Sequence, residues 1–197
     1  MEQEQGTPSR RRGVALEDAI YAATLDELIA TSFEELTFER IAARAGAGKA
    51  SVYRRWSDPA DLVLAALESY DSPEPDRFTL GEASLRDELI AVLTELASRL
   101  ELPHGRALRP LMTQRDRHPA LYARVFDLMV RPRQSRVSDV LLAAAARGEI
   151  VPQAVTPLLV RVGPQLIVAQ HMDTGAVTIA DVVEIVEQII LPAAHRI

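Results

Sequence analysis

The sequence from Thr37 to Trp56 constrains the fold more than any other part of the chain. Helix signals cover residues 38–45, where Thr37 stands at the N-cap position and Gly46 ends the segment. After a Gly-Ala-Gly turn, a second helical segment covers residues 49–56 and carries basic and aromatic side chains. Two short helices separated by a tight turn predict a helix-turn-helix, whose second helix can enter the DNA major groove, about 12 Å wide.

Positive charge is concentrated in this segment, although the chain as a whole is acidic. The 197 residues carry a formal net charge of -6. Residues 37–56 instead hold five basic side chains and one acid, a local balance of +4. Salt screens charges beyond about 10 Å, so DNA responds to the local field more than to the net charge. The sequence therefore predicts a basic DNA-binding face on an acidic protein.

The second helix of the motif has a packing face and an exposed face. Val52 and Trp56 are four residues apart, so they share one face and are expected to pack on the preceding helices. Arginine and lysine on the other face are expected to read guanine O6 and N7, and nearby hydroxyl and basic groups to bind phosphate. The predicted phosphate contacts are Thr37, Arg44 and Tyr53, and the predicted DNA-facing positions of the second helix are Lys49, Ser51, Arg54 and Arg55.

The rest of the chain is predicted to be all-α, because alternating strand patterns are absent and alanine is abundant. Further helices are expected over residues 14–31, 58–70, 82–101, 105–115, 119–146, 155–171 and 178–194. Asp58 followed by Pro59 is a strong start signal for the second of these helices. Pro132 falls inside the predicted helix over 119–146 and should kink or split it.

Composition divides the chain into three parts. Residues 1–13 are polar and contain three consecutive arginines, which predicts a disordered basic arm. Such an arm could reach the DNA backbone or minor groove, and a merely solvated tail is the alternative. The stretch DSPEPD, residues 71–76, has the clearest linker composition. We expect a helix-turn-helix domain over residues 14–60 and a larger helical domain over residues 61–197.

Several classes of protein are excluded by what the sequence lacks. The chain has no cysteine, so disulfides, cysteine zinc sites and a thiol nucleophile are ruled out. Its four histidines lack metal-ligand spacing, and it has neither a glycine-rich phosphate loop nor a Gly-x-Ser-x-Gly elbow. We therefore expect no enzyme, no metal and no cofactor. The N-terminus is not a secretory signal and no apolar stretch could span a bilayer, which predicts a cytoplasmic protein without a membrane partner.

The stretch LTFERIAARAGAGKASVYRRWSDPADLVLAAL, residues 36–67, resembles the DNA-binding segment of the TetR family of bacterial transcriptional regulators. The positions that carry the resemblance are Thr37, Ile41, Ala42, Ala45, Gly46, Tyr53, Trp56 and Leu62. AAARGEIVP, residues 144–152, and the helical remainder are similar to the family's C-terminal domain. Two positions depart from the family pattern, because Gly48 replaces a common serine and Pro59 a common lysine.

The resemblance implies an N-terminal three-helix DNA-binding domain followed by a ligand-binding and dimerisation domain. It implies a homodimeric repressor that binds double-stranded DNA at a palindromic operator and is released by a small-molecule effector. An all-helical adaptor without specific DNA binding is the alternative, which would explain the apolar helices but not the basic segment.

The same resemblance implies that the last two predicted helices pair with those of a second copy. Their apolar stripes predict a dimer interface, and a monomer that buries the stripes in its own core is the alternative. The predicted interface residues are Leu159, Val162, Leu166, Val182, Val186 and Ile189. The candidate effector contacts are polar or adaptable side chains among apolar helices, namely His104, Arg109, Met112, Tyr122, Phe126, Gln165, Gln170 and His171.

Overall fold

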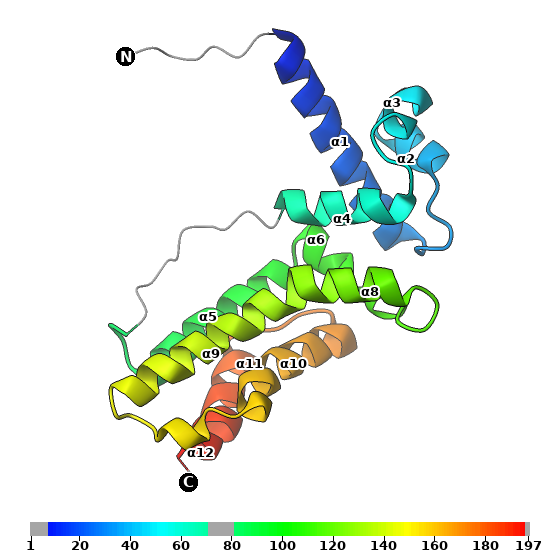
Figure 1. Cartoon of the computed structure of the whole chain (residues 1–197). Coiled ribbons are helices and arrows are strands. Elements are labelled where there is room, and N and C mark those ends of the chain that lie inside the picture. The colour runs from blue at the N-terminus through cyan, green and yellow to red at the C-terminus, as the bar shows by residue number, and fades with distance from the viewer. Residues whose placement is uncertain (1–7, 71–80, 196–197) are drawn as a thin grey trace, which may run out of the picture. The chain divides into compact units, whose positions relative to one another are not determined.

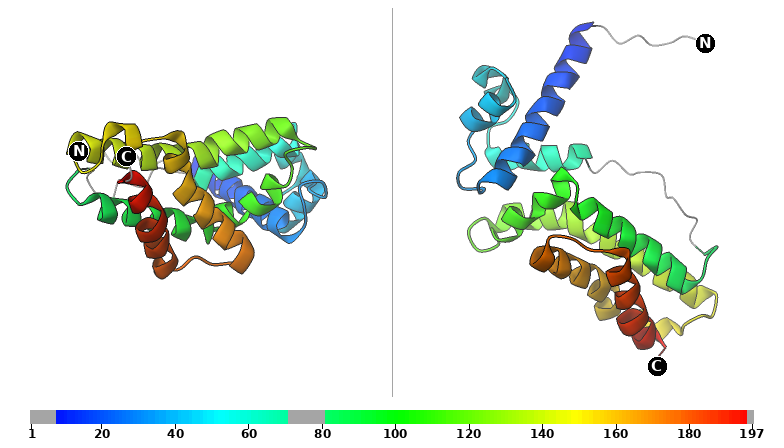
Figure 2. Two further views of the ribbon diagram at one scale, coloured as in Figure 1. Left: turned by 90° about the horizontal axis from the view of Figure 1, so that it is seen from below. Right: turned by 180° about the vertical axis from the view of Figure 1, so that it is seen from behind.

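The computed structural model describes residues 8–70 and 81–195, and within these ranges every regular element is a helix (Figures 1 and 2). The predicted all-α fold is confirmed. Contacts divide the chain into two compact units. The first unit comprises residues 1–72 and 106–124, and the second comprises residues 73–105 and 125–197. No described helix combines the length and apolar character needed to cross a bilayer.

The first unit is built around the long helix α1 (Pro8–Ala30). Helices α2 (Phe38–Arg44) and α4 (Pro59–Tyr70) both pack on α1, and α3 (Lys49–Tyr53) packs on α2 (Figure 1). The buried apolar side chains include Ile20, Leu25, Leu28, Ile41, Val52, Leu62 and Leu67. Together these contacts make a three-helix core that presents the short α3.

Two features of the first unit differ from the expected domain limits. Helix α1 begins at Pro8, so the predicted disordered arm over 1–13 is wrong for residues 8–13, and residues 1–7 lie outside the described part. Helices α7 (Leu108–Met112) and most of α8 (Pro119–Val125) also belong to this unit, although they follow the expected boundary at residue 60. Helices α7 and α8 belong to the first unit because of contacts with residues far away in the sequence, and local composition does not predict such contacts.

Capping residues fix the ends of the short helices as the sequence predicts. The Thr37 hydroxyl accepts a hydrogen bond from the Arg40 backbone N–H at 3.3 Å, and Arg40 at this position leaves no capping box. Gly46 adopts a φ of 62°, the left-handed region that lets the chain turn sharply after α2. The Asp58 carboxylate accepts from the Ala60 N–H at 2.7 Å, which starts α4.

The second unit packs α5 (Leu85–Leu100) against both α9 (Arg131–Ala146) and α10 (Pro157–Thr174) (Figures 1 and 2). Helix α6 (Pro103–Arg106) follows α5, and the 3-10 turn Pro152–Ala154 precedes α10. Helix α11 (Ile179–Ile185) also contacts α5. The largest fully buried side chains of this unit include Leu89, Leu93, Met129, Leu141 and Ile167.

Two π-helical segments precede prolines in this part of the chain. Residues Phe126–Val130 form a π segment between α8 and α9, immediately before Arg131 and Pro132. Residues Val186–Ile190 form a second one between α11 and α12 (Leu191–Ala194), which contains Pro192. Proline lacks an N–H donor and its ring crowds the carbonyl four residues earlier, which in both cases belongs to the π segment. The predicted break at Pro132 is therefore a local widening of the helix and not an interruption.

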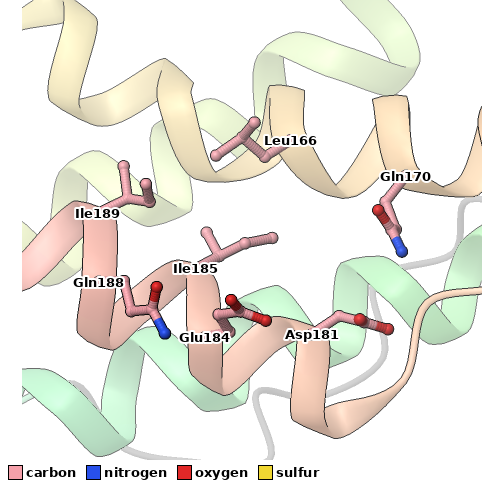
Figure 3. A pocket seen from close by; sticks show the side chains of 7 residues that line it. All are labelled: Leu166, Gln170, Asp181, Glu184, Ile185, Gln188 and Ile189. Atoms are coloured by element: carbon pink, nitrogen blue, oxygen red, sulfur yellow. The ribbon is translucent and has the colours of Figure 1, made fainter.

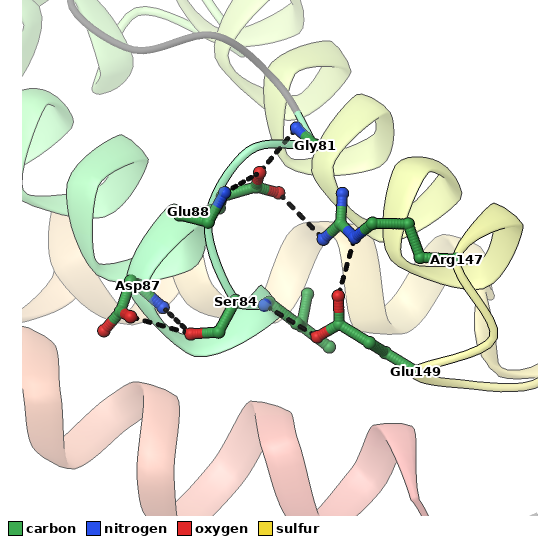
Figure 4. A network of polar contacts seen from close by, with 8 residues as sticks. Gly81, Ser84, Asp87, Glu88, Arg147 and Glu149 are labelled. Carbon is green, nitrogen blue, oxygen red and sulfur yellow. Dashed lines mark hydrogen bonds and ion pairs between the residues drawn. The ribbon is translucent and has the colours of Figure 1, made fainter.

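A buried glutamate anchors the start of α5 to the end of α9 (Figure 4). Glu88 Oε1 accepts from the Gly81 N–H at 2.6 Å, and its Oε2 lies 3.3 Å from Arg147 Nη2. Arg147 Nε also donates to Glu149, which in turn accepts from the Leu85 N–H at 2.9 Å. These contacts give the AAARGEIVP stretch a structural role, because its Arg147 and Glu149 close the network.

The predicted dimer stripe is divided between the core and the surface of the second unit. Leu159, Val182 and Val186 are buried inside the protomer, so their assignment to an interface is wrong. Leu166 and Ile189 are exposed, and Val162 is half-buried. Both helices therefore have apolar side chains on two faces, and helical periodicity alone does not distinguish the face that packs internally.

Candidate nucleic-acid interface

Helix α3 is held against the first unit by its inner face. Val52 is fully buried, and the half-buried Trp56 meets the ring of Tyr21 edge-on with centroids 5.8 Å apart. Backbone hydrogen bonds from Arg55 and Trp56 to the Val52 carbonyl extend the helical turn beyond the end of α3. The sequence-based expectation that Val52 and Trp56 form a packing face agrees with these contacts.

The outer face of α3 is exposed and cationic. Lys49, Arg54 and Arg55 are all exposed, and Ser51 is half-buried beside them. Arg55 Nη1 donates to the Ser51 carbonyl at 3.1 Å. The Arg54 backbone N–H donates to the Ala50 carbonyl, but its guanidinium makes no hydrogen bond or ion pair to the described residues. Arginine side chains on an exposed helix can reach guanine edges in a major groove. All four positions predicted to face DNA on this helix are therefore accessible.

A buried carboxylate that the sequence reasoning missed supports helix α2. Glu27 of α1 is 3% exposed and accepts hydrogen bonds from Arg40 Nε and, at 2.7 Å, from Arg44 Nε. The hydrogen bond from Arg40, aided by Arg44, lowers the pKa of Glu27 despite its burial. Glu27 lies seven residues after the buried Ile20, a spacing that places both residues on one face of the helix. This spacing could have identified Glu27 as a buried acid from the sequence.

The contact from Glu27 changes how the predicted phosphate ligand Arg44 can act. Its Nε is already committed to the buried carboxylate, although the side chain remains 42% exposed. The terminal guanidinium nitrogens are the groups that could meet a phosphate, while Nε fixes the direction of the side chain. Thr37 is also exposed, but its hydroxyl accepts the capping hydrogen bond described above.

Tyr53 is a second predicted phosphate contact with an intramolecular partner. Its ring lies edge-on to Phe38 with centroids 5.0 Å apart, and its hydroxyl donates to Glu39 Oε1 at 2.8 Å. The hydrogen bond lowers the pKa of Glu39 and raises the pKa of Tyr53. Glu39 was not predicted to take part in the site, although it is the one acid among residues 37–56.

The segment 106–124 contacts the helix-turn-helix part of the same unit at two places. Glu34, in the turn before α2, accepts hydrogen bonds from Gln114 Nε2 and Arg117 Nη1, each at 3.2 Å. Arg124 Nη1 pairs with Asp61 of α4 at 3.0 Å. Phe33 also lies edge-on to the ring of His118. The turn before α2 and helix α4 are therefore tied to a segment that follows α6 in the chain.

The predicted effector contacts do not form one group. Arg109, Met112 and Tyr122 belong to the first unit, with Arg109 exposed and Arg115 stacked over the Tyr122 ring. The second unit holds the others, of which His104 is buried, Phe126, Gln170 and His171 are half-buried and Gln165 is exposed. His171 Nδ1 lies 3.3 Å from Glu101 Oε1.

An open groove lies between α10 and the α11–π segment of the second unit (Figure 3). Its apolar lining comes from Leu166, Ile185 and Ile189, of which the first and last were predicted interface residues. The polar side chains that line it are Gln170, Asp181, Glu184 and Gln188. Among the predicted effector contacts, only Gln170 lines this groove.

Comparison with known proteins agrees with both units. Residues 20–66 match the family model for bacterial regulatory proteins, tetR family, and residues 81–189 match the tetracyclin repressor-like, C-terminal domain. An uncharacterized HTH-type transcriptional regulator of Mycobacterium tuberculosis is 31% identical over 181 residues, covering 91% of this chain and 88% of the relative. The DNA-binding transcriptional repressor TetR of Mycobacteroides abscessus is 28% identical over 138 residues, covering 70% of this chain and 72% of the repressor.

A solved structure supports the fold as well. A crystal structure from Mesorhizobium loti, described as a TetR-family transcriptional regulator, aligns with a TM-score of 0.63 and 17% identity. The alignment covers 95% of this chain and 97% of that chain, which shows a shared fold. The family models and the mycobacterial relative confirm the predicted family and exclude an enzyme. This chain belongs to the TetR family of bacterial helix-turn-helix transcriptional regulators.

Proposed function

We propose that this regulator is a homodimeric repressor that binds a palindromic operator through α3 and is released by a small-molecule effector. The observation that carries the proposal is the exposed cationic face of α3, braced from behind by the buried Val52 and the half-buried Trp56. An adaptor needs no such face. The repressor of Mycobacteroides abscessus, a relative by sequence, is itself described as DNA-binding.

A dimer follows from the small size of the reading element. One short helix contacts only a few base pairs, so a single copy discriminates poorly among sites. Two copies related by a two-fold axis would place their α3 helices about one DNA turn apart, roughly 34 Å, and would read inverted half-sites. The exposed Leu158, Leu166 and Ile189 of the second unit supply an apolar surface for this pairing.

Release by an effector is proposed to act through a shift between two conformers. The effector must bind the conformer with wrongly spaced α3 helices more tightly than the DNA-competent one. Helix α4 is the last described element before the chain enters the second unit at residue 73, so it is suited to carry the change. The pairs Arg124–Asp61 and Arg117–Glu34 offer a second route within the first unit.

Selection of bound fragments from genomic DNA of the source organism tests the DNA-binding proposal. We expect enrichment of one or a few sites that contain an inverted repeat, with half-site centres about one helical turn apart. The neighbouring genes would then suggest the effector. A salt titration on a selected site distinguishes the alternatives, because a regulator retains a tight site above a salt-sensitive background. Weak, sequence-independent binding alone would favour the adaptor.

A further inference from the structure

We propose that Glu39 is an intramolecular stand-in for a DNA phosphate, which holds the Tyr53 hydroxyl until a duplex displaces it. The inference rests on the proposed DNA-binding function and assigns to one acid the task of weakening binding to arbitrary DNA. Glu39 would thus be a specificity-determining residue of the α2–α3 surface. Its chemistry suits the role, because a carboxylate and a phosphate both accept hydrogen bonds and attract cations.

The contact between the two helices carries this inference. Tyr53 is 53% exposed on α3, and its hydroxyl donates to the Glu39 carboxylate of α2 at 2.8 Å. The Tyr53 ring is fixed edge-on against the buried Phe38, so the hydroxyl is held at a defined place on the surface. A group that is predicted to bind phosphate is therefore already bonded to an anion.

The surrounding charges strengthen the contact. The positive charge of Lys49, at the start of α3, also helps to lower the pKa of Glu39, after the hydrogen bond from Tyr53. No other acid occurs among residues 37–56, where five basic side chains are concentrated. A DNA phosphate near Tyr53 would be repelled by Glu39, and the hydroxyl cannot donate to both acceptors.

This arrangement is expected to penalise arbitrary duplexes more than the operator. Non-specific complexes are held almost entirely by phosphate contacts and can shift their register to gain another one. The operator complex is fixed in register by base contacts, so it cannot move to exploit groups that Glu39 releases. Removing the carboxylate should therefore strengthen binding to unrelated DNA and reduce the ratio of specific to non-specific affinity.

The test compares Glu39→Gln with Glu68→Gln in the full chain, using a labelled short duplex of arbitrary sequence. Both substitutions remove one negative charge from an exposed position of the first unit, so they match in net charge. We expect Glu39→Gln to tighten binding about twofold to fivefold, the scale of an exposed ion pair, and Glu68→Gln to have less effect.

A double-mutant cycle with Tyr53→Phe separates the proposed exchange from simple charge removal. If Glu39 acts by holding the hydroxyl, most of the gain from Glu39→Gln disappears when that hydroxyl is absent. An unchanged affinity, an equal gain from Glu68→Gln, or a gain that persists in Tyr53→Phe would overturn the proposal.

A measurement without DNA keeps this inference distinct from the proposed function. The hydrogen bond to Glu39 raises the pKa of Tyr53, so Glu39→Gln should lower one tyrosine pKa in a spectroscopic titration. Tyr53→Phe identifies that tyrosine by removing its transition. Glutamine can still accept the hydrogen bond but lacks the charge, so absence of the shift would show that the Glu39 charge does not hold the hydroxyl and would overturn the proposal. Normal titration with no duplex binding by the wild-type chain would instead reject the DNA-binding function, and the role of Glu39 with it.

Discussion

Helices α3 and α10 each have a face that their own unit leaves exposed, and the two faces have opposite chemistry. The face formed by α3 and the turn after it carries Lys49, Arg54 and Arg55, whereas that of α10 carries Leu158 and Leu166. A cationic face suits a polyanion, and an aliphatic face suits another apolar surface. Under the proposed function the two faces serve two different associations, with DNA and with a second copy, and substitutions should disrupt each one separately.

The largest expected effect is a loss of operator affinity when the cationic face is removed. Replacing both Arg54 and Arg55 with alanine should reduce operator affinity by at least about thirtyfold, because each lost base contact costs about 1–3 kcal/mol. Oligomeric state and thermal unfolding should stay as in the wild type, since both side chains are exposed. Gel-shift titration at two salt concentrations measures the change. Unaltered operator affinity would show that these arginines do not read the site.

The next effect concerns the aliphatic face. The double substitution of Leu166 and Ile189 with glutamate should give folded monomers, because both side chains are exposed and line the groove of the second unit. Analytical ultracentrifugation over a range of concentrations measures the association.

Substitution of Val186 by a charged residue is the control, because Val186 was predicted to lie in the interface but is buried in the protomer. It should unfold the second unit rather than dissociate a folded dimer, because an unpaired buried charge is costly. A dimer that survives the Leu166 and Ile189 substitutions would place the association surface elsewhere.

Two glycine-to-alanine substitutions, one in each unit, should change the free energy of unfolding in opposite directions. A Cβ at Gly105 would lie 2.2 Å from the Arg99 carbonyl oxygen and 2.5 Å from Leu100 Cα, so Gly105→Ala should destabilise by about 1–3 kcal/mol or more. Gly13 of α1 has open space at the same position, and Gly13→Ala should stabilise by about 0.5–1 kcal/mol through helix propensity. Denaturant unfolding compares them, and equal shifts would contradict the close approach at Gly105.

A further effect on stability concerns the support of helix α2 by Glu27. Glu27→Gln should lower stability by about 1–3 kcal/mol, because two arginines lose their charged partner. The pKa of Glu27 is lowered by folding, so its contribution is complete above the ordinary glutamate pKa, about 4.3, and is lost as pH falls through the folded value. The mutant should therefore differ most from the wild type near neutral pH and converge with it in acid.

The exposed neighbour Asp26 supplies the control for that experiment. Asp26→Asn removes the same charge one residue earlier on α1, without a buried partner among the described contacts. Its stability should remain close to that of the wild type at every pH. If both substitutions produced the same pH profile, the effect would come from net charge and not from the contacts of Glu27.

Sequence reasoning was accurate where structure depends on neighbours along the chain. The Thr37 cap, the turn at Gly46, the start of α4 after Asp58 and the burial of Val52 all follow from local geometry. These features decide where α3 lies and which of its faces is exposed, so the cationic surface could be predicted. The family resemblance then supplied the fold of the remainder.

The contacts that could not be predicted join residues far apart in the sequence. Glu27 meets Arg44 across 17 positions, and the periodicity of α1 does not reveal which partner a buried acid will find. Tyr53 and Glu39 are separated by 14 positions on different helices. On α10, the neighbours Leu158 and Leu159 have the same side chain, yet one is 66% exposed and the other is buried. Tertiary packing alone distinguishes such pairs.

The widened turns before Pro132 and Pro192 leave a signature in the spacing of the inward-facing residues. Val182, Val186, Ile190 and Ala194 are buried at strict intervals of four, as are Leu121, Val125 and Met129. In an ordinary α-helix, which has about 3.6 residues per turn, side chains spaced by four drift steadily around the helix and away from one face. A turn with one additional residue brings them back to the same face. Shortening the 186–190 segment by one residue would turn everything beyond it by about 100°, so Ala194 would leave the interior. These two prolines are tolerated because the turn before each of them contains one additional residue. Deleting the residues of each turn one at a time would locate it.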